Sequence, residues 1–192
     1  MKSLYLKSVA VLCVFVMFPL CAGAQSKVNV FLDYQYRFGL HEKLENYSIS
    51  RGKSHMYGNA LHLSALYNFT KQFSAGAGIG ADRYESPGYN TFPLFASVHF
   101  SPFKRHTGFY VFTNIGYALF AKQGTYNGWM FDVGIGYKKM FSRHFGLNFQ
   151  LGYNWKQFKG GGDYGVMVGD VIQYKKADSY RSSLTAGVGL IF

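Results

Sequence analysis

Apolar residues recur at every second position over most of this chain. Between positions 28 and 40 the even positions are all apolar or aromatic, whereas most odd positions are polar or glycine. A period of two is that of a β-strand whose two faces meet different surroundings. The alternation returns seven more times, so we expect strands at residues 28–40, 61–69, 73–82, 92–100, 109–119, 129–137, 145–155 and 184–192.

The connections between these segments differ in length. Thr70-Lys71-Gln72 is a tight turn, which pairs Phe69 with Phe73 in a hairpin. Residues 85–91 read as a turn-rich loop, and residues 41–58 as a long polar loop. Residues 159–180 read as a long glycine-rich loop, in which part of 166–174 extends the strands beyond the membrane. Short turns on one side and long loops on the other predict periplasmic termini and outward-facing loops.

The strand pattern and the composition together favour a membrane barrel. The predicted strands have about 9 to 12 residues, the length that a tilted strand needs to cross a bilayer. No later run approaches 18 apolar residues, yet aromatic residues make up 19% of the chain. We therefore predict an all-β, eight-stranded antiparallel up-and-down transmembrane β-barrel.

Aromatic residues cluster at the ends of the predicted strands, as in the girdles at the two membrane interfaces. The inner girdle consists of Phe69, Phe73, Phe100, Phe109, Tyr137, Phe145 and Phe192. The outer girdle consists of Phe38, Phe92, Trp129, Tyr153 and Trp155.

Residues 1–24 have the three parts of a secretory signal peptide. Lys2 and Lys7 form the basic start, residues 9–20 the apolar core, and Ala22-Gly23-Ala24 the cleavage box. Both cysteines lie in this segment, so residues 25–192 form a barrel domain without thiol chemistry or disulfides.

The remaining chain is strongly basic. Removing Lys2 and Lys7 from 20 basic residues leaves 18 against 9 acidic ones, a net charge of about +9. This charge indicates an anionic neighbour, for which we expect the phosphates of lipopolysaccharide in an outer membrane. No nucleic-acid-binding motif is present, so we do not expect nucleic acid as a partner.

The last strand carries a resemblance to a known family. Val188, Leu190 and Phe192 alternate up to a terminal aromatic residue, after a signal peptide and seven similar segments. In this the chain resembles the small outer-membrane β-barrels of OmpA/OmpX type, a Gram-negative, porin-like architecture. The resemblance covers the whole mature chain and implies insertion by the barrel-assembly machinery, which reads the C-terminal strand. We expect a monomer.

The inward face of the predicted barrel carries a polar set. It includes three carboxylates and three permanent cations among Asn, Gln, Ser and Gly residues. An eight-stranded barrel is just wide enough for side chains to fill, so we expect a salt-bridge and hydrogen-bond core rather than an open pore. Its ionisable members are Asp33, Arg37, His62, Asp82, His99, Asp132, Lys138 and Lys156.

The first hairpin suggests an alternative with chemistry. Pairing Phe69 with Phe73 places His62 opposite Gly80 and Ser64 opposite Gly78, with Asp82 diagonal to His62. A Ser, a His and an Asp on one face are the groups that activate a serine nucleophile, as in outer-membrane hydrolases that modify lipid A. No oxyanion donor is evident, and Ser and Asp are common lumen residues, so the structural interpretation is favoured and we expect no enzymatic activity.

Other features are assigned simpler roles. His99 is expected to be a hydrogen-bonded core residue, and no spacing of His, Asp or Glu predicts a metal site or a cofactor. The inward glycines Gly76, Gly78 and Gly80 are expected to leave room for Tyr110 and Phe112. The outer loops are rich in charge, including Glu42, and in tyrosine, so an extracellular ligand is one alternative and a solvated face beside sugar headgroups the other. Their tyrosines are Tyr47, Tyr57, Tyr89, Tyr126, Tyr164, Tyr174 and Tyr180.

Overall fold

The computed structural model describes residues 27–44, 48–103, 108–122, 124–142, 145–168 and 171–192, with the side chains of 163–168, 171–172 and 174 outside the description. The predicted signal peptide therefore lies outside the described residues. Eight long strands form the barrel: β1 Val28–Lys43, β3 Tyr57–Asn68, β4 Phe73–Glu85, β6 Pro93–Phe100, β7 Phe109–Ala118, β8 Gly128–Met140, β9 Gly146–Val168 and β10 Val171–Ile191. Two short strands, β2 Ser48–Ser50 and β5 Tyr89–Thr91, lie beside β1 and β4.

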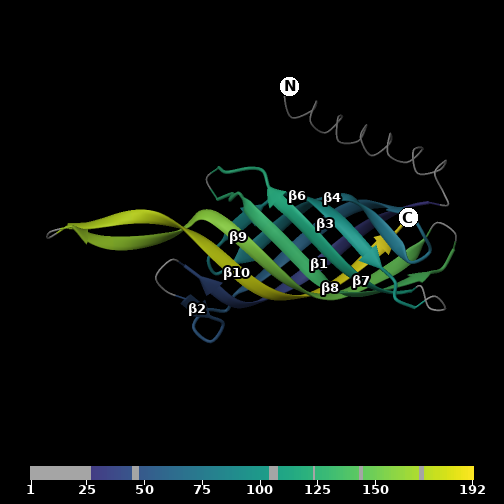
Figure 1. Cartoon of the computed structure of the whole chain (residues 1–192). Helices are drawn as coiled ribbons and strands as arrows, with labels where there is room; N and C mark the ends of the chain where they lie inside the picture. Colours follow the sequence, from purple (N-terminus) through teal and green to yellow (C-terminus); the bar gives the residue numbers. More distant parts are fainter. Residues whose placement is uncertain (1–26, 45–47, 104–107, 123, 143–144, 169–170) are drawn as a thin grey trace, which may run out of the picture.

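Each long strand pairs antiparallel with its neighbours in the chain, and β1 closes the sheet against β10 (Figure 1). At the seam Phe31 pairs with Ile191, and the amide of Phe192 donates to the carbonyl of Val30 at 2.9 Å. Closure gives the barrel strands partners on both sides and leaves no edge. The predicted eight-stranded antiparallel barrel is confirmed.

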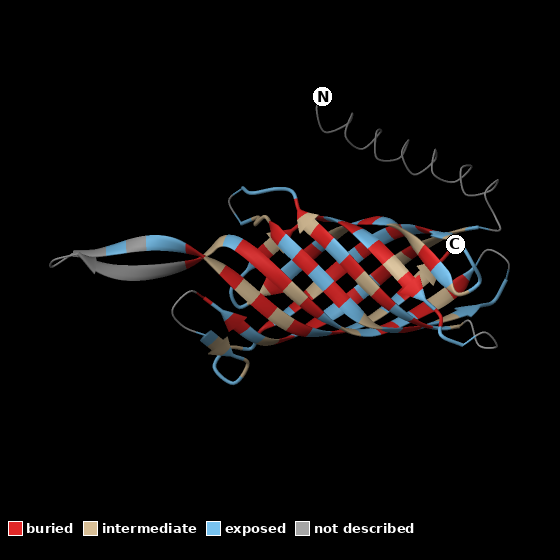
Figure 2. Ribbon diagram, viewed as in Figure 1, coloured by how far each residue is buried: buried red, intermediate tan, exposed pale blue. Residues whose placement is uncertain are grey.

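The burial pattern is inverted relative to that of a water-soluble protein. Along β1, the odd residues 31–39 are buried inside, whereas Tyr34, Tyr36 and Phe38 are exposed outside. The same checkerboard covers the barrel wall (Figure 2). An exterior of exposed Leu, Ile, Val and Phe around a polar interior fits a lipid environment, because lipid-facing and lumen-facing residues alternate in transmembrane barrels. Among the described residues, no helix is long and apolar enough to span a membrane.

The predicted glycine-rich loop at 159–180 is wrong for most of its length. β9 and β10 stay paired from Phe158 and Ser179 to Val168 and Val171, as a two-stranded ribbon that projects from the barrel (Figure 1). Asp178 holds its base, because its carboxylate accepts from the Gly160 amide at 3.1 Å and from Gln157 Nε2 at 2.8 Å. Gly160, Gly161 and Gly162 do not break the strand. Gly162 pairs with Ala177 in the ladder, and Gly160 and Gly161 lie beside the register shift between Ala177 and Ser179.

Inward glycines make room for aromatic rings, although not for those that were predicted. A Cβ on Gly78 would lie 2.5 Å from Phe95 Cζ, and one on Gly80 2.6 Å from His62 Cδ2. Phe112 lies beside Gly134 and Gly152 instead, and Tyr110 beside Gly136. Each ring lies on the inner face of the wall, over the glycine that pairs with it on the neighbouring strand.

Candidate functional site

Asp82 on β4 is the centre of the polar lumen. Its carboxylate accepts from Arg37 Nη1 at 3.0 Å and from the Thr91 hydroxyl at 3.3 Å, and lies 2.8 Å from His62 Nε2. Arg37, His62 and Asp82 come from β1, β3 and β4, and all three are buried. A buried carboxylate needs such partners, because an unpaired charge is costly away from water.

A second carboxylate, Asp132 on β8, occupies the opposite wall. It accepts from Asn154 Nδ2 at 2.5 Å and from Asn114 Nδ2 at 3.5 Å. Lys156 is fully buried between Asp82 and Asp132, and its Nζ has no direct hydrogen-bond partner among the described residues. The Lys156 ammonium therefore interacts electrostatically with both the Asp82 and the Asp132 carboxylates, without a direct hydrogen bond to either.

The third carboxylate, Asp33, lies nearer the end that carries the chain termini. Asn148 donates to it at 2.7 Å, and the Tyr110 hydroxyl in turn donates to Asn148. His99 stacks on Tyr110 with ring centroids 4.4 Å apart, and Lys138 Nζ lies 6.0 Å from the centre of the same ring. This end of the lumen is thus filled by amides and rings.

A fourth charged cluster, which the sequence did not reveal, closes the other end. Arg181 on β10 donates from Nε to Glu42 Oε2 at 2.7 Å, and Nη2 donates to the same oxygen. Arg181 also donates to the carbonyls of Glu85 and Ser86 at 2.8 and 3.0 Å. Glu42 further accepts from Ser179 and from the Tyr89 hydroxyl. These bonds hold the β4–β5 connection across the mouth of the barrel.

An aromatic layer separates this mouth cluster from the Asp82 centre. Tyr84, Tyr89 and Phe158 are almost completely buried and pack together, with Tyr89 and Phe158 stacked at 4.3 Å. The Tyr84 ring lies 4.9 Å from the guanidinium of Arg37 and 5.7 Å from that of Arg181. Burial, and then the Glu42 carboxylate, raise the pKa of the Tyr89 phenol above its ordinary value, so this hydroxyl stays protonated as a donor.

Two loop predictions are corrected by this layer. Glu42 was assigned to a solvated outer loop, but the register of β1 shifts between Gly39 and His41, and this bulge turns the even position 42 inward. Tyr89 was assigned to an exposed tyrosine-rich surface and a loop, but it begins strand β5 and is 3% exposed. Arg181 lies at one of the odd positions of β10 that face the lumen. Extending the alternation of residues 184–192 to lower residue numbers would have identified it from the sequence.

The predicted hairpin register is confirmed, with His62 opposite Gly80 and Ser64 opposite Gly78. The residues of the hydrolase alternative meet only in part. His62 Nε2 contacts Asp82 and Arg37, whereas Nδ1 is buried without a hydrogen bond among the described residues. Ser64 therefore does not hydrogen-bond to His62, and the Phe95 ring lies 5.0 Å from the imidazole. The described residues contain no group of three His, Cys, Asp or Glu that fits a metal ion.

The C-terminal residues that were singled out face the outside of the barrel. Val188 and Phe192 are exposed, and Phe145 packs edge-on against Phe192 at 6.2 Å. The Phe69 and Phe73 rings lie 5.8 Å apart at the same end. The terminal strand therefore presents an apolar, aromatic surface at the end of the barrel where β1 begins.

No family model and no curated protein matches this chain. Among solved structures it is similar to the outer membrane protein AlkL in DMPC bilayers, at 13% identity and a TM-score of 0.47 over 88% of this chain and 92% of that one. It is also similar to Neisserial surface protein A, at 15% identity and a TM-score of 0.41 over 84% and 95%. The assignment of the fold rests on the closed strand pairing and the inverted burial, not on these similarities.

Proposed function

We propose that this chain is an integral outer-membrane protein with a structural or surface-interaction role. The observation that carries the proposal is the combination of an apolar exterior with a lumen of paired charges and packed rings. Such a barrel serves as a membrane anchor that presents its long connections and the β9–β10 ribbon. The same proposal makes the barrel monomeric and OmpX-like, without catalytic activity or cofactor.

The long connections and the ribbon lie at the end away from the chain termini. We place this end outside the cell and the termini in the periplasm, because outer-membrane barrels have short periplasmic turns and longer outer loops. Removal of residues 1–24 as a signal peptide, insertion by the barrel-assembly machinery and contact with lipopolysaccharide belong to the same proposal. An extracellular ligand would bind the outer connections.

Heat-modifiable gel migration after refolding into phospholipid vesicles tests the membrane barrel. We expect a fast-migrating folded band that converts to a slower one on boiling, together with ion conductance no greater than that of protein-free bilayers. A chain that stays soluble without detergent refutes the barrel's location, and stable conductance steps refute the filled lumen.

The alternative is a lipid A-modifying hydrolase that uses Ser64, His62 and Asp82. The contact between His62 and Asp82 favours it, whereas the missing Ser64–His62 hydrogen bond and the enclosure of the group inside the wall disfavour it. Mass spectrometry of lipid A from cells with the wild-type chain and with His62→Ala distinguishes the two. We expect identical acylation, and an acylation change that needs His62 refutes the non-enzymatic proposal.

A further inference from the structure

A hollow lies on the outer wall of the barrel beside the connection between β7 and β8, at the end away from the chain termini. Its volume is about 320 Å³. Phe92 and Phe120 form its apolar side, with their rings edge-on and the centroids 6.2 Å apart. Lys122 and Thr125 form the other side, and backbone hydrogen bonds of 3.1 and 2.7 Å join these two residues in both directions. The lining of the hollow therefore includes a cation on a hydrogen-bonded turn.

A second lysine reaches the same part of the wall from β9. The Nζ of Lys159 lies 5.5 Å from the centre of the Tyr117 ring, which packs edge-on against Trp129 at 5.2 Å. Leu119 follows Tyr117 two positions later, and its amide donates to the carbonyl of Phe92 beside the hollow. Two residues span about 7 Å in an extended chain, so the Lys159–Tyr117 pair and the hollow are neighbours on the outer surface.

These two lysines lie on a side of the barrel that is almost free of carboxylates. Between Glu85 and Asp163 the sequence contains one acidic residue, Asp132, and its side chain is buried in the lumen. Neither lysine forms an ion pair among the residues that the structure describes. Asp178, at the base of the ribbon, accepts the two hydrogen bonds given above instead. Both exposed lysines are therefore available to an anion from outside the chain.

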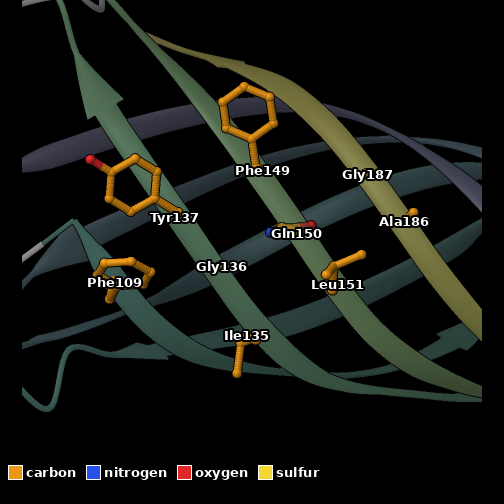
Figure 3. Close-up of a pocket in the computed structure, with 9 residues that line it drawn as sticks. All are labelled: Phe109, Ile135, Gly136, Tyr137, Phe149, Gln150, Leu151, Ala186 and Gly187. Carbon is orange, nitrogen blue, oxygen red and sulfur yellow. The ribbon is translucent and has the colours of Figure 1, made fainter.

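The larger groove of the outer wall differs in this respect. Its volume is about 400 Å³, and it lies over β7 to β10 beside the rings of Phe109, Tyr137 and Phe149 (Figure 3). None of its described lining residues is charged. Such a surface suits any acyl chain, whereas the hollow at Phe92 combines an apolar side with a cation.

We propose that the hollow and the adjoining Lys159–Tyr117 pair bind one phosphorylated glycolipid of the lipid A class. An acyl chain packs against Phe92 and Phe120, and phosphates of the sugar headgroup pair with Lys122 and Lys159. Aromatic rings and lysines at a membrane interface contact acyl chains and anionic headgroups together. Two separate cations fit a headgroup with more than one phosphate better than a phospholipid with a single phosphate. The inference rests on the proposed membrane location and orientation of the barrel, which put this end in the outer leaflet.

Native mass spectrometry of the folded barrel released from detergent tests the site. Three probes are titrated separately: diphosphorylated lipid A, the same lipid A after removal of both phosphates, and phosphatidylglycerol. We expect the diphosphorylated form to be retained about 25-fold more than the dephosphorylated one, because each of the two cations contributes about fivefold. Phosphatidylglycerol, with one phosphate, should be retained to an intermediate extent.

Two lysine substitutions test the headgroup contacts. Lys122→Gln and Lys159→Gln should each lower retention of diphosphorylated lipid A about fivefold and leave retention of the dephosphorylated form unchanged. Lys53→Gln is the matched control, because Lys53 is an exposed lysine of another outer connection and does not line the hollow. A Lys53→Gln effect as large as that of Lys122→Gln would mean that the lipid responds only to net charge, which overturns the site.

Phe120→Ala tests the hollow itself. We expect this variant to weaken retention of both forms of lipid A, because it removes one apolar side. Phe103→Ala is its control, since Phe103 is 57% exposed against 56% for Phe120 but lies at the end that carries the chain termini. Equal losses in the two variants overturn the site.

The wild-type chain alone also decides the proposal. Equal retention of diphosphorylated and dephosphorylated lipid A overturns it, and so does retention of phosphatidylglycerol as strong as that of diphosphorylated lipid A. Heat-modifiable migration in the same detergent keeps folding separate from lipid binding. A barrel that folds without discriminating these lipids refutes the glycolipid site alone. A wild-type chain that does not fold in detergent refutes the proposed membrane function, and the site with it.

Discussion

Replacing Glu42 by glutamine tests the electrostatic closure of the mouth. The substitution keeps the size and an acceptor oxygen of the side chain, but it leaves the Arg181 guanidinium without its anion. Both side chains are almost completely inaccessible, at 1% and 0% exposure. Removing one partner of a buried pair costs about 3–5 kcal/mol, because the remaining charge stays desolvated. The unfolding equilibrium constant should therefore rise by about a hundredfold to a few thousandfold.

Urea unfolding in phospholipid vesicles, followed by the fluorescence of Trp129 and Trp155, measures this cost. With a slope of about 2 kcal/mol per molar urea, the midpoint should fall by about 2 M. Glu85→Gln is the matched control: its pair with Arg83 is also short, at 2.7 Å, but the side chains are 30% and 47% exposed. Exposed pairs contribute little, so the midpoint should not change measurably.

Equal midpoint shifts for Glu42→Gln and Glu85→Gln would refute the reasoning, since burial is what distinguishes the two pairs. A second comparison separates the ion pair from the packing around it. The double variant Glu42→Leu with Arg181→Met removes both charges and should recover most of the lost stability, because a buried pair is often replaceable by apolar side chains. A double variant as unstable as Glu42→Gln would mean that the hydrogen bonds of Arg181 to the β4–β5 connection dominate.

Three further outcomes are expected. Gly78→Ala should destabilise the barrel by about 1–3 kcal/mol in the same urea assay, because its Cβ would meet Phe95 and Ser64, whereas Gly52→Ala should not, because its Cβ would make an ordinary contact with Ser50 Oγ at 4.0 Å. Replacing residues 163–176 by an Asn-Gly turn should leave the barrel's midpoint and gel migration unchanged, because the described strand residues of the ribbon beyond Gly162 and Ala177 pair with each other; a lost folded band would contradict this. Thr91→Val should cost about 1 kcal/mol in the urea midpoint through the lost hydrogen bond to Asp82, and an unchanged midpoint would show that Asp82 needs no third partner.

The alternation of side chains was sufficient to predict the strands and their inward faces. Its period of two survives wherever the ladder is regular, so Phe69 and Phe73 set the register of the first hairpin down to His62 and Gly80. The prediction of the inward face failed where a β-bulge interrupts the period of two. The bulge after Gly39 reversed the side on which Glu42 lies, and no local signal in the sequence marks it.

The remaining differences come from contacts between residues far apart in the chain. Tyr89 resembles any loop tyrosine until Phe158 and Glu42, from two other strands, enclose it. The ribbon at β9–β10 contains Gly160-Gly161-Gly162, which normally indicates an irregular loop, but cross-strand pairing overrides that local preference. The ring that covers each inward glycine likewise depends on which residue of the neighbouring strand pairs with that glycine, and composition does not determine this pairing.

The seam between β1 and β10 also constrains how this protein folds. Phe31 pairs with Ile191, so the ladder that closes the ring joins segments from opposite ends of the described chain. Contacts of such long sequence separation carry the largest loop-closure entropy and form slowly. Hairpins such as β3–β4 have no such delay, so the kinetic barrier should reside in ring closure, after the local hairpins have formed. Until that step the edges of β1 and β10 remain open to pairing with other chains, which makes the period before closure the one most exposed to aggregation.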